Sequence, residues 1–159
     1  MVMLVHVTAA KLEPKIKRSG LRARFGVYAF PVLPSHTLTH QWTRELSKWT
    51  RQPMIGVYFR IPDDEAVRFG RYGQVMRTLP AACAVGEISK LADPRGQQVI
   101  VERTITAREI TRIAAIRGVL GWRHMPDAHG RKPCGCPACV ARGEPGAREL
   151  RRRYDSGEL

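Results

Sequence analysis

The residues best suited to chemistry in the last third of this 159-residue chain are three cysteines and a histidine. They follow the pattern His129-x4-Cys134-x-Cys136-x2-Cys139. Thiolate and imidazole groups bind zinc tetrahedrally, and a glycine and a proline between the cysteines allow the turn that would bring them around one ion. We therefore predict a structural Cys3His zinc site, whose four protein ligands leave no position open for substrate. An iron–sulfur cluster, a redox pair and free thiols are the alternatives, and His124 is a second candidate histidine ligand.

Length and composition favour an ordinary globular protein. The chain is 43% hydrophobic and 26% charged, which excludes a disordered polymer. No apolar run approaches the roughly 18 residues that a membrane span requires. The first residues lack the basic and long apolar stretches of a signal peptide, so we expect a cytoplasmic protein without membrane contact. In that compartment clustered cysteines favour a metal over disulfides.

The charge of the chain favours a polyanionic partner. Lys and Arg number 27 against 14 Asp and Glu, which gives a net charge of +13 and a pI near 10.5. Such a chain attracts nucleic acids at long range, and arginine suits bidentate contacts with phosphate. The segment 1–60 holds ten of the basic residues but only two acidic ones. We therefore expect nucleic acid, DNA or RNA, to meet the N-terminal third.

The elements that must position these residues alternate irregularly. We expect strands at 3–7, 26–30, 54–61, 98–103 and 113–122, and helices that end at Gly20, follow Ser35 and span 80–91. The segment 63–78 is expected to be a loop or a short edge strand. Because no regular βαβ units are present, the pattern predicts an α+β fold.

Two helices carry side chains that we assign to the core. Leu38, Trp42, Leu46 and Trp49 recur on one helical stripe, which is typical of core packing, with stacking on bases as the alternative. Cys83 falls on an apolar helix face and is expected to be buried. A capping box over 106–109 should open a further short helical turn.

Several short motifs lie in a suggestive order along residues 3–122. His6 and Thr8 share the first strand, and the helix after it ends in Ser19-Gly20-Leu21. Gly26-Val27-Tyr28 then opens a strand, and a late strand over 97–102 precedes the segment 105–110, which begins and ends with isoleucine. This order resembles the ADP-ribosyltransferase superfamily, which includes poly(ADP-ribose) polymerases, DNA-targeting transferases of toxin–antitoxin systems and tRNA 2′-phosphotransferases.

The resemblance implies a split mixed or antiparallel sheet with short helices and a site for NAD. His6 would hydrogen-bond the adenosine-side ribose of NAD with support from Thr8, and Tyr28 would stack on the nicotinamide ring. Arg22, Arg24, Arg44 and Arg51 flank the implied cleft in sequence, and one of them would hold the pyrophosphate. The alternative for both His6 and Tyr28 is a structural residue of the core.

The resemblance also assigns a catalytic position, and this chain departs from the family there. The family places a glutamate on the late strand, which stabilises an oxocarbenium-like transition state. Gln98 matches that position best, and a neutral amide cannot supply the negative charge. Glu102 is an acid in the same strand, and we expect it on the same face about 13 Å further along.

These observations lead to three hypotheses about function. The first is an NAD-dependent mono-ADP-ribosyltransferase that modifies a nucleic acid or a protein, either active or disabled by Gln98, with an antitoxin-type protein as a further partner. The second is a zinc-stabilised, basic nucleic-acid-binding module without enzymatic activity. The third is an enzyme similar to the RNA 2′-phosphotransferases. We expect the transferase-like domain over 1–122, the Cys/His zinc segment over 123–146 and a basic tail over 147–159.

Overall fold

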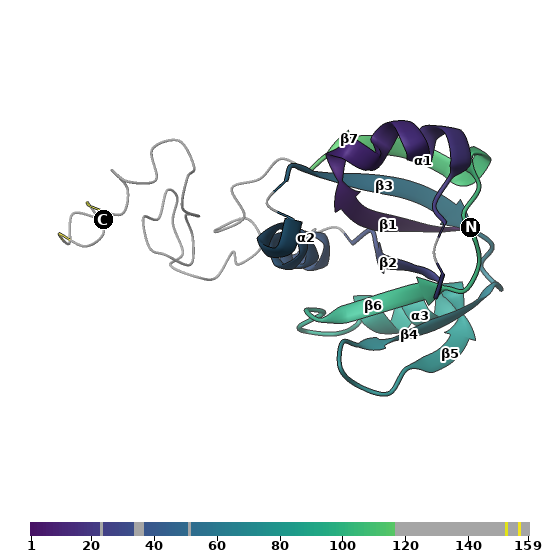
Figure 1. The fold of residues 1–159 in the computed structure, drawn as a ribbon. Coiled ribbons are helices and arrows are strands. Elements are labelled where there is room, and N and C mark those ends of the chain that lie inside the picture. Colours follow the sequence, from purple (N-terminus) through teal and green to yellow (C-terminus); the bar gives the residue numbers. More distant parts are fainter. Residues whose placement is uncertain (23, 34–36, 51, 117–151, 153–155, 157–159) are drawn as a thin grey trace. The chain divides into compact units, whose positions relative to one another are not determined.

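An antiparallel sheet of seven strands organises the part of the chain that the computed structural model describes, residues 1–22, 24–33, 37–50 and 52–116 together with Arg152 and Ser156. The strand order is β5-β4-β6-β2-β1-β3-β7. With a few short helices packed on the sheet, the architecture confirms the predicted α+β class (Figure 1). Met1–Ile116 forms one compact unit.

The helices and strands have the following bounds. The strands are β1 Val2–Ala9, β2 Val27–Pro31, β3 Met54–Ile61, β4 Ala66–Arg71, β5 Arg77–Pro80, β6 Gln97–Val101 and β7 Ile110–Ala115. The α-helices are α1 Glu13–Ser19, α2 Thr37–Thr50 and α3 Ala81–Ser89, and 3₁₀ turns cover Ala10–Leu12 and Ala107–Glu109.

The sheet separates into two groups of strands between β1 and β2. β1 pairs with β3 along its whole length, but with β2 only at Leu4↔Pro31 and Val5↔Phe30. Figure 1 shows β1, β3 and β7 in one group and β2, β6, β4 and β5 in the other. Because β1 and β2 do not pair beyond Val5 and Phe30, backbone groups of β2 there can hydrogen-bond to side chains of β1.

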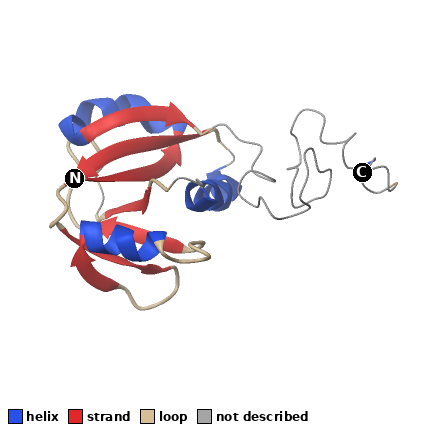
Figure 2. Ribbon diagram, turned by 180° about the vertical axis from the view of Figure 1, so that it is seen from behind, coloured by secondary structure: helices blue, strands red, loops and turns tan. Residues whose placement is uncertain are grey.

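The core lies between the sheet and the helices packed on it. Consecutive residues are buried along much of the central strands, 98–101 of β6 and 54–57 of β3 among them. Figure 2 shows α1 against the β1–β3–β7 group and α3 against the other group. The largest fully buried side chains are Phe59, Leu4, Leu38, Ile61, Ile88, Ile100 and Ile105.

The structure corrects the expectation for residues 63–78 in part. β5, which begins in this segment, is a short edge strand, but the segment also contains β4, which lies inside the sheet and forms a hairpin with β5. Val67 and Phe69 alternate with exposed or half-buried neighbours and enter the core, which is the pattern of a strand with one buried face. Gly73 adopts a positive φ in the connecting turn, a conformation that glycine tolerates best.

The expectation of a buried Cys83 was wrong, because its side chain is exposed. α3 buries Ala81, Ala84 and Ile88, a spacing of i, i+3 and i+7, and Cys83 lies off that stripe.

The last strand begins three residues earlier than expected, at Ile110. The capping box is confirmed: the Thr106 side chain accepts from the backbone N–H of Glu109, and the Glu109 side chain accepts from the backbone N–H of Thr106.

No helix in the described part of the chain is long and apolar enough to cross a membrane.

Candidate functional site

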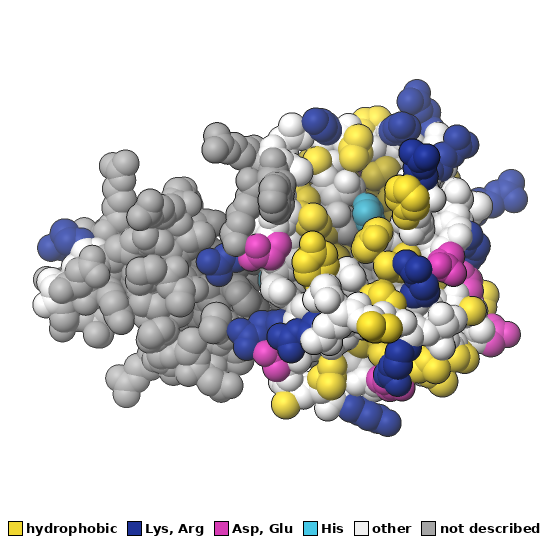
Figure 3. All heavy atoms as spheres, turned by 60° about the horizontal axis from the view of Figure 1, so that its bottom comes forward, with side chains coloured by type: hydrophobic (Ala, Val, Ile, Leu, Met, Phe, Trp, Pro, Cys, Tyr) yellow, Lys and Arg dark blue, Asp and Glu magenta, His cyan; other side chains and the backbone are white. Residues whose placement is uncertain are grey.

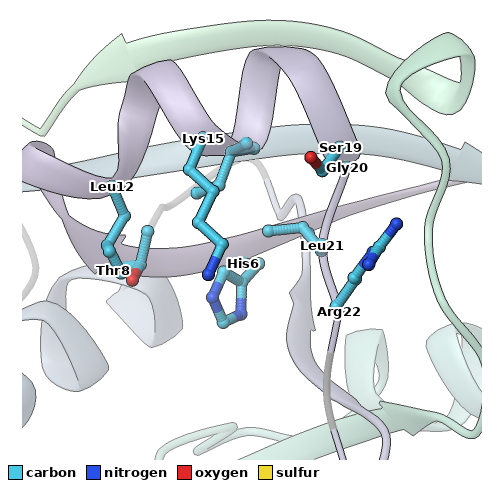
Figure 4. Close-up of a pocket in the computed structure, with 9 residues that line it drawn as sticks. His6, Thr8, Leu12, Lys15, Ser19, Gly20, Leu21 and Arg22 are labelled. Atoms are coloured by element: carbon cyan, nitrogen blue, oxygen red, sulfur yellow. The ribbon is translucent and has the colours of Figure 1, made fainter.

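A cavity of about 160 Å³ lies between β1 and α1 (Figure 4). Its lining residues are His6, Thr8, Leu12, Lys15, Ile16, Ser19, Gly20, Leu21 and Arg22. None of the nine is acidic, and two of them are cations. The cavity therefore offers hydroxyl groups, an imidazole and positive charge, which suits a ligand that carries hydroxyl groups and phosphate.

His6 occupies the point at which β1 and β2 separate. Its Nδ1 lies 2.7 Å from the backbone carbonyl oxygen of Tyr28. A carbonyl oxygen only accepts hydrogen bonds, so Nδ1 must donate and carry the hydrogen. Burial lowers the pKa of His6, which keeps the imidazole neutral near pH 7. In a neutral ring with hydrogen on Nδ1, Nε2 is a hydrogen-bond acceptor.

The wall opposite His6 is α1. Ile16 is buried and holds the helix to the sheet, while Leu12, Lys15 and Ser19 line the cavity. Figure 4 shows the Lys15 side chain extending from α1 towards the imidazole of His6. The cavity thus places a positive charge beside a neutral acceptor.

The chain leaves α1 through a glycine that no other residue could replace without rearrangement. Gly20 has φ 71° and ψ −165°, a region that is essentially restricted to glycine. A Cβ atom there would lie 2.0 Å from the backbone oxygen of Ile105. The close approach allows Leu21 and Ile105 to exchange two backbone hydrogen bonds of 2.8 and 3.0 Å. This contact fixes the segment that carries Arg22 at the mouth of the cavity.

A charged cluster supports Ile105 from the other side. Arg103 donates to the carboxylates of Glu65 and Glu109, with distances of 2.7 to 3.1 Å. Glu109 also accepts from the backbone N–H and the hydroxyl of Thr106. These hydrogen bonds lower the pKa of Glu109, and the bonds from Arg103 contribute most. The segment beneath Gly20 is therefore held rigidly although it lies at the surface.

Tyr28 is not a core residue, because 45% of its surface is exposed. Its carbonyl group positions His6, and its ring is not among the lining groups of the cavity. Tyr28 pairs with Ile100 of β6, so the two side chains lie on the same side of the sheet. Gln98, two residues from Ile100, projects to that side as well.

Gln98 lies in an apolar setting. It is 8% exposed, and its side-chain nitrogen lies 3.9 Å from the sulfur of Met76. Glu102 lies beyond the end of β6, is exposed and pairs with Arg68 at 3.2 Å. Arg24 stacks over the Phe25 ring, 5.4 Å from its centroid.

The structure thus brings together some of the predicted site residues and separates others. His6, Thr8 and Arg22 line one cavity, and Tyr28 adjoins it through its backbone. Gln98, Glu102 and Arg24 are not among the lining residues. Sequence reasoning missed Lys15 and Ser19. Their spacing from Leu12 places all three on one side of a helix, and that was the available signal.

A second hollow of about 230 Å³ lies between the β4–β5 hairpin and α3. Its lining includes Arg77, which pairs with Glu87 and stacks over Phe69, 4.7 Å from the ring centroid. The lining also holds Arg71 and the acidic Glu87, whereas the lining of the His6 cavity holds no acid, so the His6 cavity is the better site for an anion.

The predicted zinc ligands His129, Cys134, Cys136 and Cys139 lie outside the described residues. Within the described ranges, no three Asp, Glu, His or Cys side chains are grouped so that they could hold a metal ion. No family model, curated protein or solved structure matches this chain.

Proposed function

We propose that this chain binds NAD at the separation between β1 and β2 and is an ADP-ribosyltransferase whose catalytic position is occupied by glutamine. The observation that carries the proposal is the neutral imidazole of His6. Its tautomer is fixed by the Tyr28 carbonyl group, and it faces a cavity with cations and no acid. A split sheet with a histidine on its first strand also agrees with the resemblance found in the sequence.

The groups around the cavity match the chemistry of NAD one by one. A ribose hydroxyl would donate to Nε2 of His6, and the Thr8 hydroxyl would bind the neighbouring hydroxyl group. Lys15 and Arg22 would neutralise the pyrophosphate. The exposed ring of Tyr28 would stack on the cationic nicotinamide ring at the rim.

The reaction would transfer ADP-ribose to an acceptor nucleophile. The nucleophile attacks the anomeric carbon of the nicotinamide-side ribose, the bond from that carbon to the nicotinamide nitrogen breaks, and nicotinamide leaves with the bonding electron pair. The acceptor loses its proton to solvent. Positive charge grows on the ribose in the transition state, and a carboxylate would stabilise it. Gln98 supplies no charge, so we expect binding of NAD with very slow turnover.

Release of nicotinamide by three forms of the full chain tests this function. Gln98→Glu should increase the rate at least about 100-fold, the scale of one well-placed electrostatic group. Burial beside Met76 raises the pKa of the introduced carboxyl group, so the gain should grow from pH 6 to pH 8. Glu102→Gln is the control and should change nothing, because Glu102 is exposed beyond the end of β6 and pairs with Arg68. The proposal fails if Gln98→Glu binds NAD and releases no more nicotinamide than the native chain.

A second candidate is the RNA 2′-phosphotransferase reaction, which the resemblance also includes. The absence of an acidic residue from the lining of the cavity favours it, because that branch handles phosphate with cationic groups and does not use the glutamate. A 2′-phosphorylated oligoribonucleotide incubated with NAD distinguishes the two. Loss of the 2′-phosphate by the native chain, unaffected by Gln98→Glu, would favour this reaction.

A further inference from the structure

The two flanks of α1 differ in charge. Successive residues of a helix are rotated by about 100°, and Leu12 and Ser19 mark the side that faces the cavity. Moving outward from that side, Lys15 comes first and Arg18 follows, and Lys11 lies in the 3₁₀ turn that precedes the helix. All three are exposed, and we call them the basic flank.

The opposite flank is neutral. There Lys17 pairs with Glu13 at 2.6 Å, an i, i+4 contact along the helix. In contrast, no ion pair found among the described residues involves Lys11, Lys15 or Arg18. Figure 3 shows several Lys and Arg side chains at one margin of a face on which hydrophobic groups surround a histidine, and others spread over the rest of that face. The uncompensated charge therefore lies on the cavity side of α1.

Exposed aromatic rings follow the basic flank along the chain. Phe25 is 73% exposed and lies under the guanidinium group of Arg24, and Tyr28 is 45% exposed. Large apolar rings are unfavourable in water, and proteins that bind single strands use such rings as stacking platforms for bases. A row of cations followed by exposed rings is the combination that a flexible polynucleotide requires.

We propose that the basic flank and Phe25 form the docking surface for a single-stranded nucleic acid. Its phosphate groups would follow Lys11 and Arg18, and one of its bases would stack on Phe25, while Lys15 remains for the proposed nucleotide site. A duplex hides its base faces from such a ring, so a single strand is the form of nucleic acid that fits this surface. The role of this strand as acceptor rests on the proposed transferase function, whereas its binding does not.

Binding of labelled oligonucleotides of about 12 nucleotides to the full chain tests the proposal. Single-stranded DNA, single-stranded RNA and duplex DNA of one sequence are titrated from about 50 to about 300 mM NaCl. The variant Lys11→Gln/Arg18→Gln should lower the slope of log K against log salt by about 1.4, about 0.7 for each lost charge. Its affinity at about 100 mM NaCl should fall roughly tenfold.

The matched control removes one lysine and one arginine elsewhere. Arg60 and Lys90 are exposed, lie on β3 and after α3, and join no ion pair found among the described residues. Arg60→Gln/Lys90→Gln should therefore leave both slope and affinity unchanged. Phe25→Ala should weaken binding at least about fivefold without changing the salt slope, because stacking releases no counterions.

Three results would overturn the docking surface: equal losses in the two double variants, no loss with Phe25→Ala, or duplex binding as tight as that of the single strand. Preference between DNA and RNA identifies the natural strand. NAD binding by Lys11→Gln/Arg18→Gln should equal that of the native chain. Loss of oligonucleotide binding with NAD binding intact thus separates this surface from the proposed nucleotide site.

Discussion

The two sides of the split sheet are equipped very differently. On the β1 side, His6 is neutral, its tautomer is set by a backbone carbonyl group, and a cavity with two cations opens beside it. On the β6 side, Gln98 is an uncharged amide in contact with a thioether. The first side has what recognition of a nucleotide requires, and the second lacks the charge that transfer chemistry requires.

Under the proposed function, this difference makes binding and turnover separable. NAD binding would depend on donors and acceptors held by β1, α1 and the Leu21–Ile105 contact, none of which involves Gln98. Turnover would depend on charge at one position of β6. Each of the following predictions changes one side and leaves the other as its reference.

The largest effect is expected at Gly20, which holds the β1 side together. Gly20→Ala places a Cβ atom 2.0 Å from the oxygen of Ile105 in a backbone conformation that alanine avoids. We expect the free energy of unfolding in urea to fall by about 3 kcal/mol or more. Gly86→Ala is the control, because a Cβ there meets nothing within 4 Å; it should stabilise α3 by about 0.5–1 kcal/mol. Equal effects of the two changes would refute the role of the Gly20 contact.

A smaller effect is expected from the buried imidazole when the pH falls. The pKa of His6 is lowered in the folded state, so below pH 6.5 the unfolded chain takes up a proton that the folded chain does not. The free energy of unfolding should therefore fall with decreasing pH below 6.5, by at most about 1.4 kcal/mol per pH unit from this group. In His6→Asn this contribution should disappear, whereas the amide can still donate to Tyr28. Parallel pH profiles of the two chains between pH 7 and pH 5 would contradict the assignment.

The smallest effect is expected from the charge at the wall of the cavity. Lys15→Met should weaken NAD binding roughly three- to tenfold, because an exposed lysine gives a modest charge-assisted contact. Lys17→Met, on the opposite flank of the same helix, should leave NAD binding unchanged. A loss of equal size in both variants would mean that the net charge of the chain, rather than the cavity, attracts the ligand.

The sequence was most informative where local signals agree with the tertiary structure. Met54–Ile61 is a strand as predicted, because its β-branched and aromatic residues suit a buried position in the sheet. The capping box at Thr106 was predicted because its hydrogen bonds join residues only three apart in the sequence. The family resemblance placed His6, Thr8 and Arg22 at one site with Tyr28 and Arg24; the first three line one cavity, whereas Arg24 and the Tyr28 ring do not.

The remaining features depend on contacts that a sequence pattern does not contain. The hairpin of β4 and β5 was missed because its few buried residues are separated by arginines and glycines. Cys83 was misplaced because the buried stripe of α3 consists mainly of alanines. Lys15 became a site residue only once α1 was packed over His6, and the lowered pKa of His6 arises from burial that the fold creates.

Calorimetric titration of NAD into the native chain and into His6→Asn at pH 7.5 tests the central claim most directly. The account predicts one NAD bound per native chain with a Kd below about 1 mM, and a Kd at least about tenfold higher for His6→Asn. Thr8→Val, which removes only a hydroxyl group from the same cavity, should show a smaller loss and serves if His6→Asn does not fold. Absence of binding by the native chain, or equal binding by the native and variant chains, would contradict the account.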